Sequence, residues 1–333
     1  MADTFAGMAN RFSGVIAAVA AAAAASPADA RPICEADPPT GASPIMSRPM
    51  ALPRTRRATG ARIAIPFAPP LGETAHYRLR SISGERSRPR ISEIDFSLRF
   101  ERAPGGYRMT IVRTANDEQR AAGPAAAVAF VERPMIFRLD PGGRVVAMEG
   151  EEAFWAALAA VLPEPSERTA PDASDLRHLL LRLSLLRDDP AEERTPTLAA
   201  FAAPVLGHAR ATVVPRDARP GLQTVPTMSG STMVHVSRYA TRVARGRLFV
   251  AVESSPPAMQ LETLLQSSLP PDRGSDLALL ASSHRYEAEV SLATGLARRA
   301  FTEIRADVDW NGRCRQLIDS HEVTLIGRRA SRR

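Results

Sequence analysis

Apolar and polar residues alternate in two parts of the chain. In residues 95–101 every second residue is apolar, and the same alternation resumes at 107–111 after the turn sequence Ala103-Pro104-Gly105-Gly106. A period of two indicates strands with one buried face, and Pro and Gly favour the turn that joins them. A second hairpin is predicted for Met135–Leu139 and Arg144–Met148, which are joined by a Pro-Gly-Gly turn at 140–143.

The spacing of apolar residues changes between 151 and 206. Here they recur with a period of about 3.6, which is typical of amphipathic helices. One stripe contains Phe154, Trp155 and Leu158, and a second stripe runs from Leu176 to Leu186. The sequence therefore predicts a helical segment over residues 151–206.

The strand pattern returns near residue 209. Strands are expected at 209–214, 232–239 and 243–253, followed by a meander from 286 to 326 with turns at 293–295 and 311–312. Short turns between consecutive strands require antiparallel pairing. The expected fold class is α+β, a mostly antiparallel sheet with a helical insertion in the middle of the chain. A half-open barrel and a large curved sheet both satisfy this pattern.

The N-terminus has the order of a secretory signal peptide. Arg11 precedes an apolar run at 12–25, and Ala28 and Ala30 occupy the small-residue positions of a cleavage site. We expect export to the periplasm with cleavage after Ala30. Met1 and Met8 both remain candidate start residues.

The rest of the chain divides by composition. Residues 31–62 are rich in Pro and Arg without apolar periodicity, which predicts a disordered leader. Residues 63–327 are expected to form a single antiparallel β domain that includes the helical segment. Residues 328–333 form a basic tail.

Charge changes this picture only slightly. The 333 residues carry a formal charge of +7, and all 43 basic residues are Arg, because the chain contains no Lys. The tail has no aromatic residue for base stacking, so we expect no nucleic-acid partner. The tail is instead a candidate contact for an anionic membrane surface through four arginines: Arg328, Arg329, Arg332 and Arg333.

The chain contains two cysteines, Cys34 and Cys314. In an oxidising compartment such a pair is a candidate disulfide, which would tie the start of the mature chain to a late strand. The alternative is that both thiols stay free.

No local motif for catalysis is present. The sequence lacks a nucleophile elbow, a phosphate-binding loop, a dinucleotide fingerprint and a zinc-protease motif. The six histidines are scattered, and no two are spaced to share a helix face. We therefore predict no catalytic residue, metal or cofactor and disfavour an enzyme, although groups far apart in sequence can still assemble a nucleophile triad.

Helices inserted between two sets of antiparallel strands suggest a cup that holds an acyl chain. The arrangement resembles the outer-membrane lipoprotein carrier superfamily in its signal peptide, its long meanders and the hairpin Tyr286–Ala306 around Thr294-Gly295-Leu296. The resemblance covers about 63–327 in outline and implies an unclosed antiparallel barrel lined by helices.

The leading functional hypothesis is a periplasmic, non-catalytic binding or carrier protein for a lipid or other apolar ligand. The alternative is an envelope scaffold or interaction protein with a filled core and no small ligand. The residues expected in the cavity wall are Phe154, Trp155, Leu158, Leu179, Leu183 and Phe201.

Overall fold

The computed structural model of the chain forms two compact units that interleave along the sequence. The first unit contains residues 1–68, 80–92 and 203–324, and the second contains 69–79, 93–202 and 325–333. The residues that the structure describes are 50, 52, 62–87, 89–122, 124–162, 180, 183–184, 186–187, 189–200, 202–207, 212–213, 217–218, 221–227, 230–254, 277–310 and 313–330.

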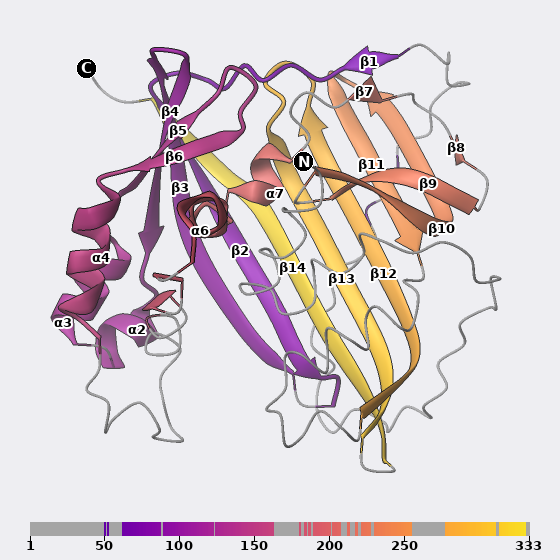
Figure 1. Cartoon of the computed structure of the whole chain (residues 1–333). Coiled ribbons are helices and arrows are strands. Elements are labelled where there is room, and N and C mark those ends of the chain that lie inside the picture. The colour runs from indigo at the N-terminus through magenta and orange to yellow at the C-terminus, as the bar shows by residue number, and fades with distance from the viewer. Residues whose placement is uncertain are drawn as a thin grey trace. The chain divides into compact units, whose positions relative to one another are not determined.

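Long antiparallel strands build the first unit and lie side by side in Figure 1. Their order is β14 (Arg313–Ala330), β13 (Ala297–Trp310), β12 (Leu277–Ser291), β11 (Arg247–Ser254) and β10 (Gly230–Ala244). Two further strands, β8 (Asp217–Ala218) and β9 (Gly221–Thr227), pair with β10. A separate pair joins β1 (Ile63–Ala64) to β7 (Thr212–Val213). The predicted antiparallel meander is confirmed.

One face of these strands carries the apolar core of the first unit. Val250, Tyr286 and Ala300 come from neighbouring strands and pack in one buried cluster with Ile65 and Val213. Because side chains alternate between the faces of a strand, the cluster takes every second residue over 248–252 of β11 and over 286–290 of β12, and Ala297 and Ala300 of β13 complete it. The other face is the charged one described below.

The turn between β12 and β13 shows why glycine is needed there. Gly295 has φ +73°, and a Cβ at this position would lie 1.9 Å from the carbonyl oxygen of Pro66. Only glycine combines this left-handed conformation with so close an approach of another backbone segment.

The second unit begins with the two predicted hairpins, and both are confirmed. The strand order is β6 (Val145–Glu149), β5 (Met135–Leu139), β4 (Gly106–Thr114) and β3 (Arg90–Ala103). Strand β2 (Glu73–Glu85), like β3 and β14, contributes residues to both units. The protein is therefore mostly antiparallel sheet, and the described strands do not close into a ring. The choice between a half-open barrel and a curved sheet stays a prediction.

The helical insertion is not confirmed as one segment. Within 151–206 the structure describes α4 (Glu151–Ala159), α6 (Ala191–Leu198) and α7 (Ala203–Leu206). Of the second predicted stripe, Leu176 and Leu179 lie outside the described residues, whereas Leu180, Leu183 and Leu186 are buried. Two further helices, α2 (Asp117–Ala122) and α3 (Ala125–Val131), are not predicted by the apolar spacing, because each is shorter than two full helical turns.

Other sequence predictions lie outside the described part of the chain. These are the signal peptide with Ala28 and Ala30, most of the leader, Cys34, and the last two tail arginines. Strand β14 extends to Ala330, so Arg328 and Arg329 are strand residues at its end. Cys314 lies on the same strand, opposite Asp309 of β13, and its pairing with Cys34 stays a prediction.

Candidate functional site

A hollow of about 430 Å³ lies in the second unit. Strands β2, β3 and β4 and the end of β14 supply its lining. The lining residues are His76, Tyr77, Asp95, Phe96, Thr114, Ile326, Gly327, Arg328 and Arg329. A site of this size is large enough for a small organic ligand.

Two stacked aromatic rings line the hollow. The ring centroids of Tyr77 and Phe96 are 5.5 Å apart and the ring planes differ by 17°. Both side chains are 1% exposed, whereas Ile326, also in the lining, is 53% exposed. The stacked rings therefore form a rigid, buried part of the lining, and Ile326 is an aliphatic lining side chain that still contacts water.

The only carboxylate in this lining is already paired. Arg78 Nε donates to Asp95 Oδ1 at 2.8 Å and Nη2 donates to Oδ2 at 3.0 Å. The hydrogen bonds from Arg78 hold the pKa of Asp95 below its usual value, and the same contact raises the pKa of Arg78. Asp95 is therefore ionised near neutral pH, and its charge is balanced by Arg78.

The remaining charges in the lining are cationic. Arg328 and Arg329 are exposed, and neither forms an ion pair with a residue that the structure describes. The hollow thus combines apolar walls with two guanidinium groups that are available to an anion.

The cavity wall predicted from the sequence lies elsewhere. Helix α4 buries three of the predicted residues, Phe154, Trp155 and Leu158. The ring centroid of Phe154 lies 5.1 Å from that of Trp155 and 5.2 Å from that of Phe130 on α3. Leu183 is also buried, whereas Leu179 and Phe201 lie outside the described residues. None of the four predicted residues that the structure describes lines the hollow. The wall assignment itself stays a prediction.

Polar contacts fix the packing of α4. Trp155 Nε1 donates to Glu151 Oε1 at 3.1 Å, and Arg194 of α6 pairs with the same carboxylate. The Arg194 guanidinium also lies 5.8 Å from the Trp155 ring centroid. These contacts link the first turn of α4 to α6 and favour a filled arrangement.

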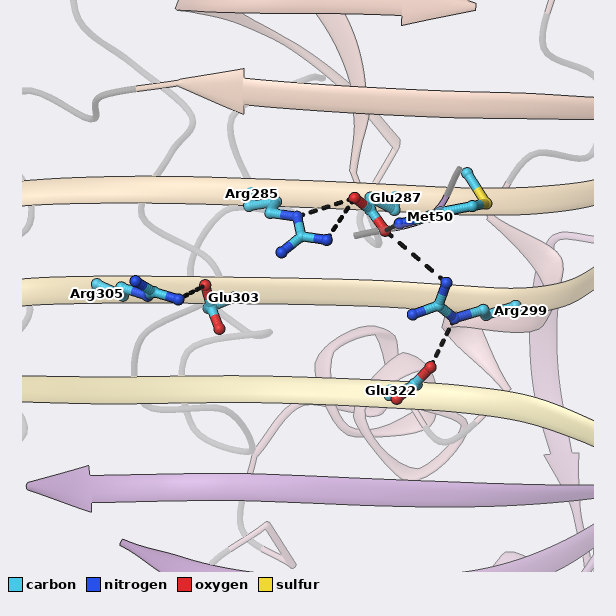
Figure 2. Close-up of polar contacts among 7 residues, drawn as sticks. All are labelled: Met50, Arg285, Glu287, Arg299, Glu303, Arg305 and Glu322. Atoms are coloured by element: carbon cyan, nitrogen blue, oxygen red, sulfur yellow. Dashed lines mark hydrogen bonds and ion pairs between the residues drawn. The ribbon is translucent and has the colours of Figure 1, made fainter. Parts of the chain in front are cut away.

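Figure 2 shows polar contacts among charged side chains of β12, β13 and β14 in the first unit. On β12 these side chains alternate with those of the apolar core, so they form the charged face of this unit. Arg285 donates to Glu287 Oε1 from Nε at 2.9 Å and from Nη2 at 2.6 Å. Arg299 lies between two carboxylates, with Nη1 3.9 Å from Glu287 Oε2 and Nε 2.6 Å from Glu322 Oε1. The amide of Met50 donates to Glu287 Oε2 at 2.8 Å.

This charged face is unusually well buried for ionised groups. The side chains of Glu287 and Glu303 are each 6% exposed, and Glu303 pairs with Arg305 at 2.9 Å. A buried charge is costly without a partner, so the cross-strand contacts of Arg299 with Glu287 of β12 and Glu322 of β14 favour this register of the three strands.

The fold places each of two histidines beside hydroxyl groups that are distant in the sequence. His284 contacts Ser254 Oγ at 3.3 Å through Nδ1 and Thr302 Oγ1 at 3.2 Å through Nε2. Burial lowers the pKa of His284 to about 4. His321 contacts Ser81 Oγ at 2.9 Å, and its other ring nitrogen lies 3.2 Å from Asp319. The described residues contain no group of three or more side chains suited to hold a metal ion.

The described helices give no membrane span, since none is both long and apolar enough to cross a bilayer.

Comparison with known proteins gives no family. No family model matches the chain, and no curated protein matches its sequence. A solved structure described as "lipid-protein interactions in lipovitellin" is similar with a TM-score of 0.40 and 11% identity, over 79% of this chain and 26% of that chain. The chain thus spans about a quarter of that neighbour's length. This likeness assigns neither a family nor a ligand, and the similarity to the lipoprotein carriers stays an interpretation of the sequence pattern.

Proposed function

We propose that this chain is an exported binding or carrier protein for an amphiphile with an apolar body and one anionic group. The observation that carries the proposal is the hollow in the second unit, where stacked aromatic rings and Ile326 lie beside two guanidinium groups. Its volume of about 430 Å³ falls in the range of small-molecule sites. Export rests on the signal peptide predicted at residues 1–30.

The apolar part of the ligand would lie chiefly against Ile326, an apolar lining side chain that is open to water. The rings of Tyr77 and Phe96 are already buried and stacked, so ordering this part of the lining costs little conformational entropy. Covering the exposed half of Ile326 contributes about 1 kcal/mol, because burying a whole aliphatic side chain contributes roughly 1.5–3 kcal/mol.

The anionic part of the ligand would pair with Arg328 and Arg329. A planar guanidinium donates two parallel hydrogen bonds to a carboxylate or a phosphate, which gives both affinity and orientation. Asp95 does not compete for these arginines, since Arg78 already takes both of its oxygens. A fatty acid and an anionic phospholipid share the chemistry that this site recognises.

The test uses the full chain, a fatty acid such as palmitate, and its neutral monoacylglycerol. Ile326→Asp is expected to weaken palmitate binding at least tenfold, measured by calorimetric titration. Val146→Asp is the matched control, because Val146 is 62% exposed in the same unit and does not line the hollow. Equal affinities of the two variants would overturn the proposal.

A second pair of variants tests the charge. Replacing Arg328 and Arg329 together by Glu is expected to abolish the preference for palmitate over the neutral lipid. Arg138→Glu, on the exposed face of β5, is expected to leave that preference unchanged. A preference that survives the double replacement would remove the anion from the proposal.

The alternative, an envelope scaffold without a small ligand, is favoured by one observation. Strand β6 is the outer strand of the described order, and Val146 stands exposed on it. An outer strand offers unpaired backbone groups to a partner. Under this alternative, Val146→Asp reduces co-purification with the cell envelope while Ile326→Asp does not, and the reverse pattern supports the carrier.

A further inference from the structure

Ser81, His321 and Asp319 meet in the first unit although they are far apart in the chain. Ser81 lies on β2, whereas Asp319 and His321 lie two residues apart on β14 and therefore share a face of that strand. Ser81 Oγ is 2.9 Å from His321 Nδ1. His321 Nε2 is 3.2 Å from Asp319 Oδ1, an ion-pair distance without the alignment of a hydrogen bond.

We propose that Ser81 is an activated nucleophile that accepts an acyl group from small carboxylic esters. A hydroxyl, an imidazole and a carboxylate in this order are the groups that activate serine in many acyl-transfer enzymes, and unliganded sites often hold such contacts loosely. With the proton on Nε2 beside Asp319, the lone pair of Nδ1 faces the Ser81 hydroxyl. None of these three residues lines the hollow of the second unit.

Access distinguishes this group from a buried polar network. Ser81 is partly exposed, and the side chains of His321 and Asp319 are 21% and 16% exposed. The proposal requires that a small ester reach the hydroxyl through this partly exposed side of the group.

The acyl transfer needs no reactant other than these residues and the ester. The Ser81 Oγ–H bond breaks as Oγ forms a bond to the ester carbonyl carbon, and the proton passes to His321 Nδ1. The carbon–oxygen bond to the leaving group then breaks, and the departing alkoxide or phenoxide takes that proton from Nδ1. The products are acyl-Ser81 and the free alcohol, with Asp319 positioning the ring and balancing the transient imidazolium.

The chain contains its own comparison at Ser254. This serine also contacts a histidine, His284, at 3.3 Å. The second ring nitrogen of His284 contacts the hydroxyl of Thr302 instead of a carboxylate, and all three residues are buried. A serine–histidine contact without an acid and without access is expected to stay unreactive.

The experiment exposes the folded full chain to p-nitrophenyl acetate and measures acetylation by intact mass and peptide mapping. The chain has no Lys, so acetylation of lysine side chains does not contribute to the signal. Acetylation is expected on Ser81, at a rate at least tenfold above that of the exposed neighbour Ser83. The Ser83→Ala variant identifies the signal that comes from Ser83. His321→Gln and Asp319→Asn are each expected to slow acetylation of Ser81 at least tenfold.

Two measurements separate a positioning role for Asp319 from a structural one. Asp319→Glu is expected to restore most of the rate lost in Asp319→Asn, while circular dichroism and the thermal midpoint report that the sheet is intact. Acetate spread evenly over several serines, equal labelling of Ser81 and Ser254, or an unchanged rate in His321→Gln would overturn the proposal. If Asp319→Asn unfolds the chain, the acetylation rates of Ser81 and Ser83 in the wild-type protein still test the proposal.

Discussion

The guanidinium of Arg78 holds the carboxylate of Asp95 through two parallel hydrogen bonds, Nε to Oδ1 at 2.8 Å and Nη2 to Oδ2 at 3.0 Å. Asp95 lines the hollow of the second unit, and Arg78 neutralises it there. The charge left in the lining is then that of Arg328 and Arg329. A ligand with an anionic group would therefore complement the charge of the lining.

Removing the guanidinium is expected to change stability in a pH-dependent way. Arg78→Gln should lower the free energy of unfolding by about 0.5 kcal/mol near neutral pH, a small value because both side chains are more than one-third exposed. Arg78 lowers the pKa of Asp95, so its contribution is present above the unfolded-state pKa, about 3.9, and is lost as pH falls through the lower folded-state pKa. Urea unfolding of both proteins at neutral and acidic pH measures this. A difference that persists at the acid end contradicts the assignment.

His284 is expected to make the protein less stable in mild acid. Its imidazole protonates near pH 6.5 in the unfolded chain but stays neutral to about 4 when folded, because it is buried. The unfolded state therefore binds more protons between these values, and the free energy of unfolding falls by about 3 kcal/mol as pH decreases through this window.

Replacing His284 isolates this contribution. His284→Gln keeps a polar side chain between Ser254 and Thr302 and removes the titration. Its unfolding free energy should vary less between pH 6.5 and 4 than that of the wild type. Parallel pH profiles for the two proteins would show that other groups cause the acid sensitivity.

The buried pair of Arg285 and Glu287 is expected to show strong coupling. Arg285→Met and Glu287→Leu should each destabilise the protein by about 3 kcal/mol, because each leaves a buried charge with one partner fewer. The double variant should be more stable than the two single effects added together predict. A double-mutant cycle by chemical unfolding measures the coupling energy.

An exposed pair serves as the control for that cycle. Arg99 and Glu101 lie 3.0 Å apart, with side chains 43% and 40% exposed. Their coupling should be at most about 0.5 kcal/mol. Equal coupling energies in the two cycles would contradict the expectation that burial strengthens the ion pairs on the charged face of the first unit.

The packed group around α4 provides a test between two ligand sites. Leu158 is 1% exposed, so Leu158→Ala should lower the unfolding free energy by roughly 2–5 kcal/mol. If the hollow holds the ligand, palmitate affinity should change less than twofold in the folded variant. A large loss of affinity, with the thermal midpoint above the assay temperature, would instead place the ligand at the wall predicted from Phe154 and Trp155.

Much of the sheet follows from the sequence because alternation is a local property. Phe96, Leu98 and Phe100 alternate with polar neighbours, and all three are 1% exposed in the structure. The strand ends are predicted less accurately. The sequence pattern ends one strand at 239 and begins the next at 243, whereas β10 continues to Ala244 and the turn falls at Arg245 and Gly246. Arg245 has φ 52°, a conformation that the sequence pattern does not signal for arginine.

The candidate sites were not predictable in the same way. The stack of Tyr77 on Phe96 joins two strands whose register is not set by local spacing. His321 and Asp319 show the spacing of one strand face, but their partner Ser81 is 240 residues away. The alternating Phe96 was the one lining residue identified from the sequence as part of an apolar face, and Arg328 and Arg329 were identified by charge.

A crystal structure with an ω-bromo fatty acid tests most directly whether the hollow of the second unit binds an anionic amphiphile. An anomalous bromine peak is expected in the hollow, near Ile326 and the buried rings of Tyr77 and Phe96, with the carboxylate within hydrogen-bond distance of Arg328 or Arg329. A bromine site against Phe154 and Trp155, or a saturated crystal with an empty hollow, would show that the ligand does not bind there.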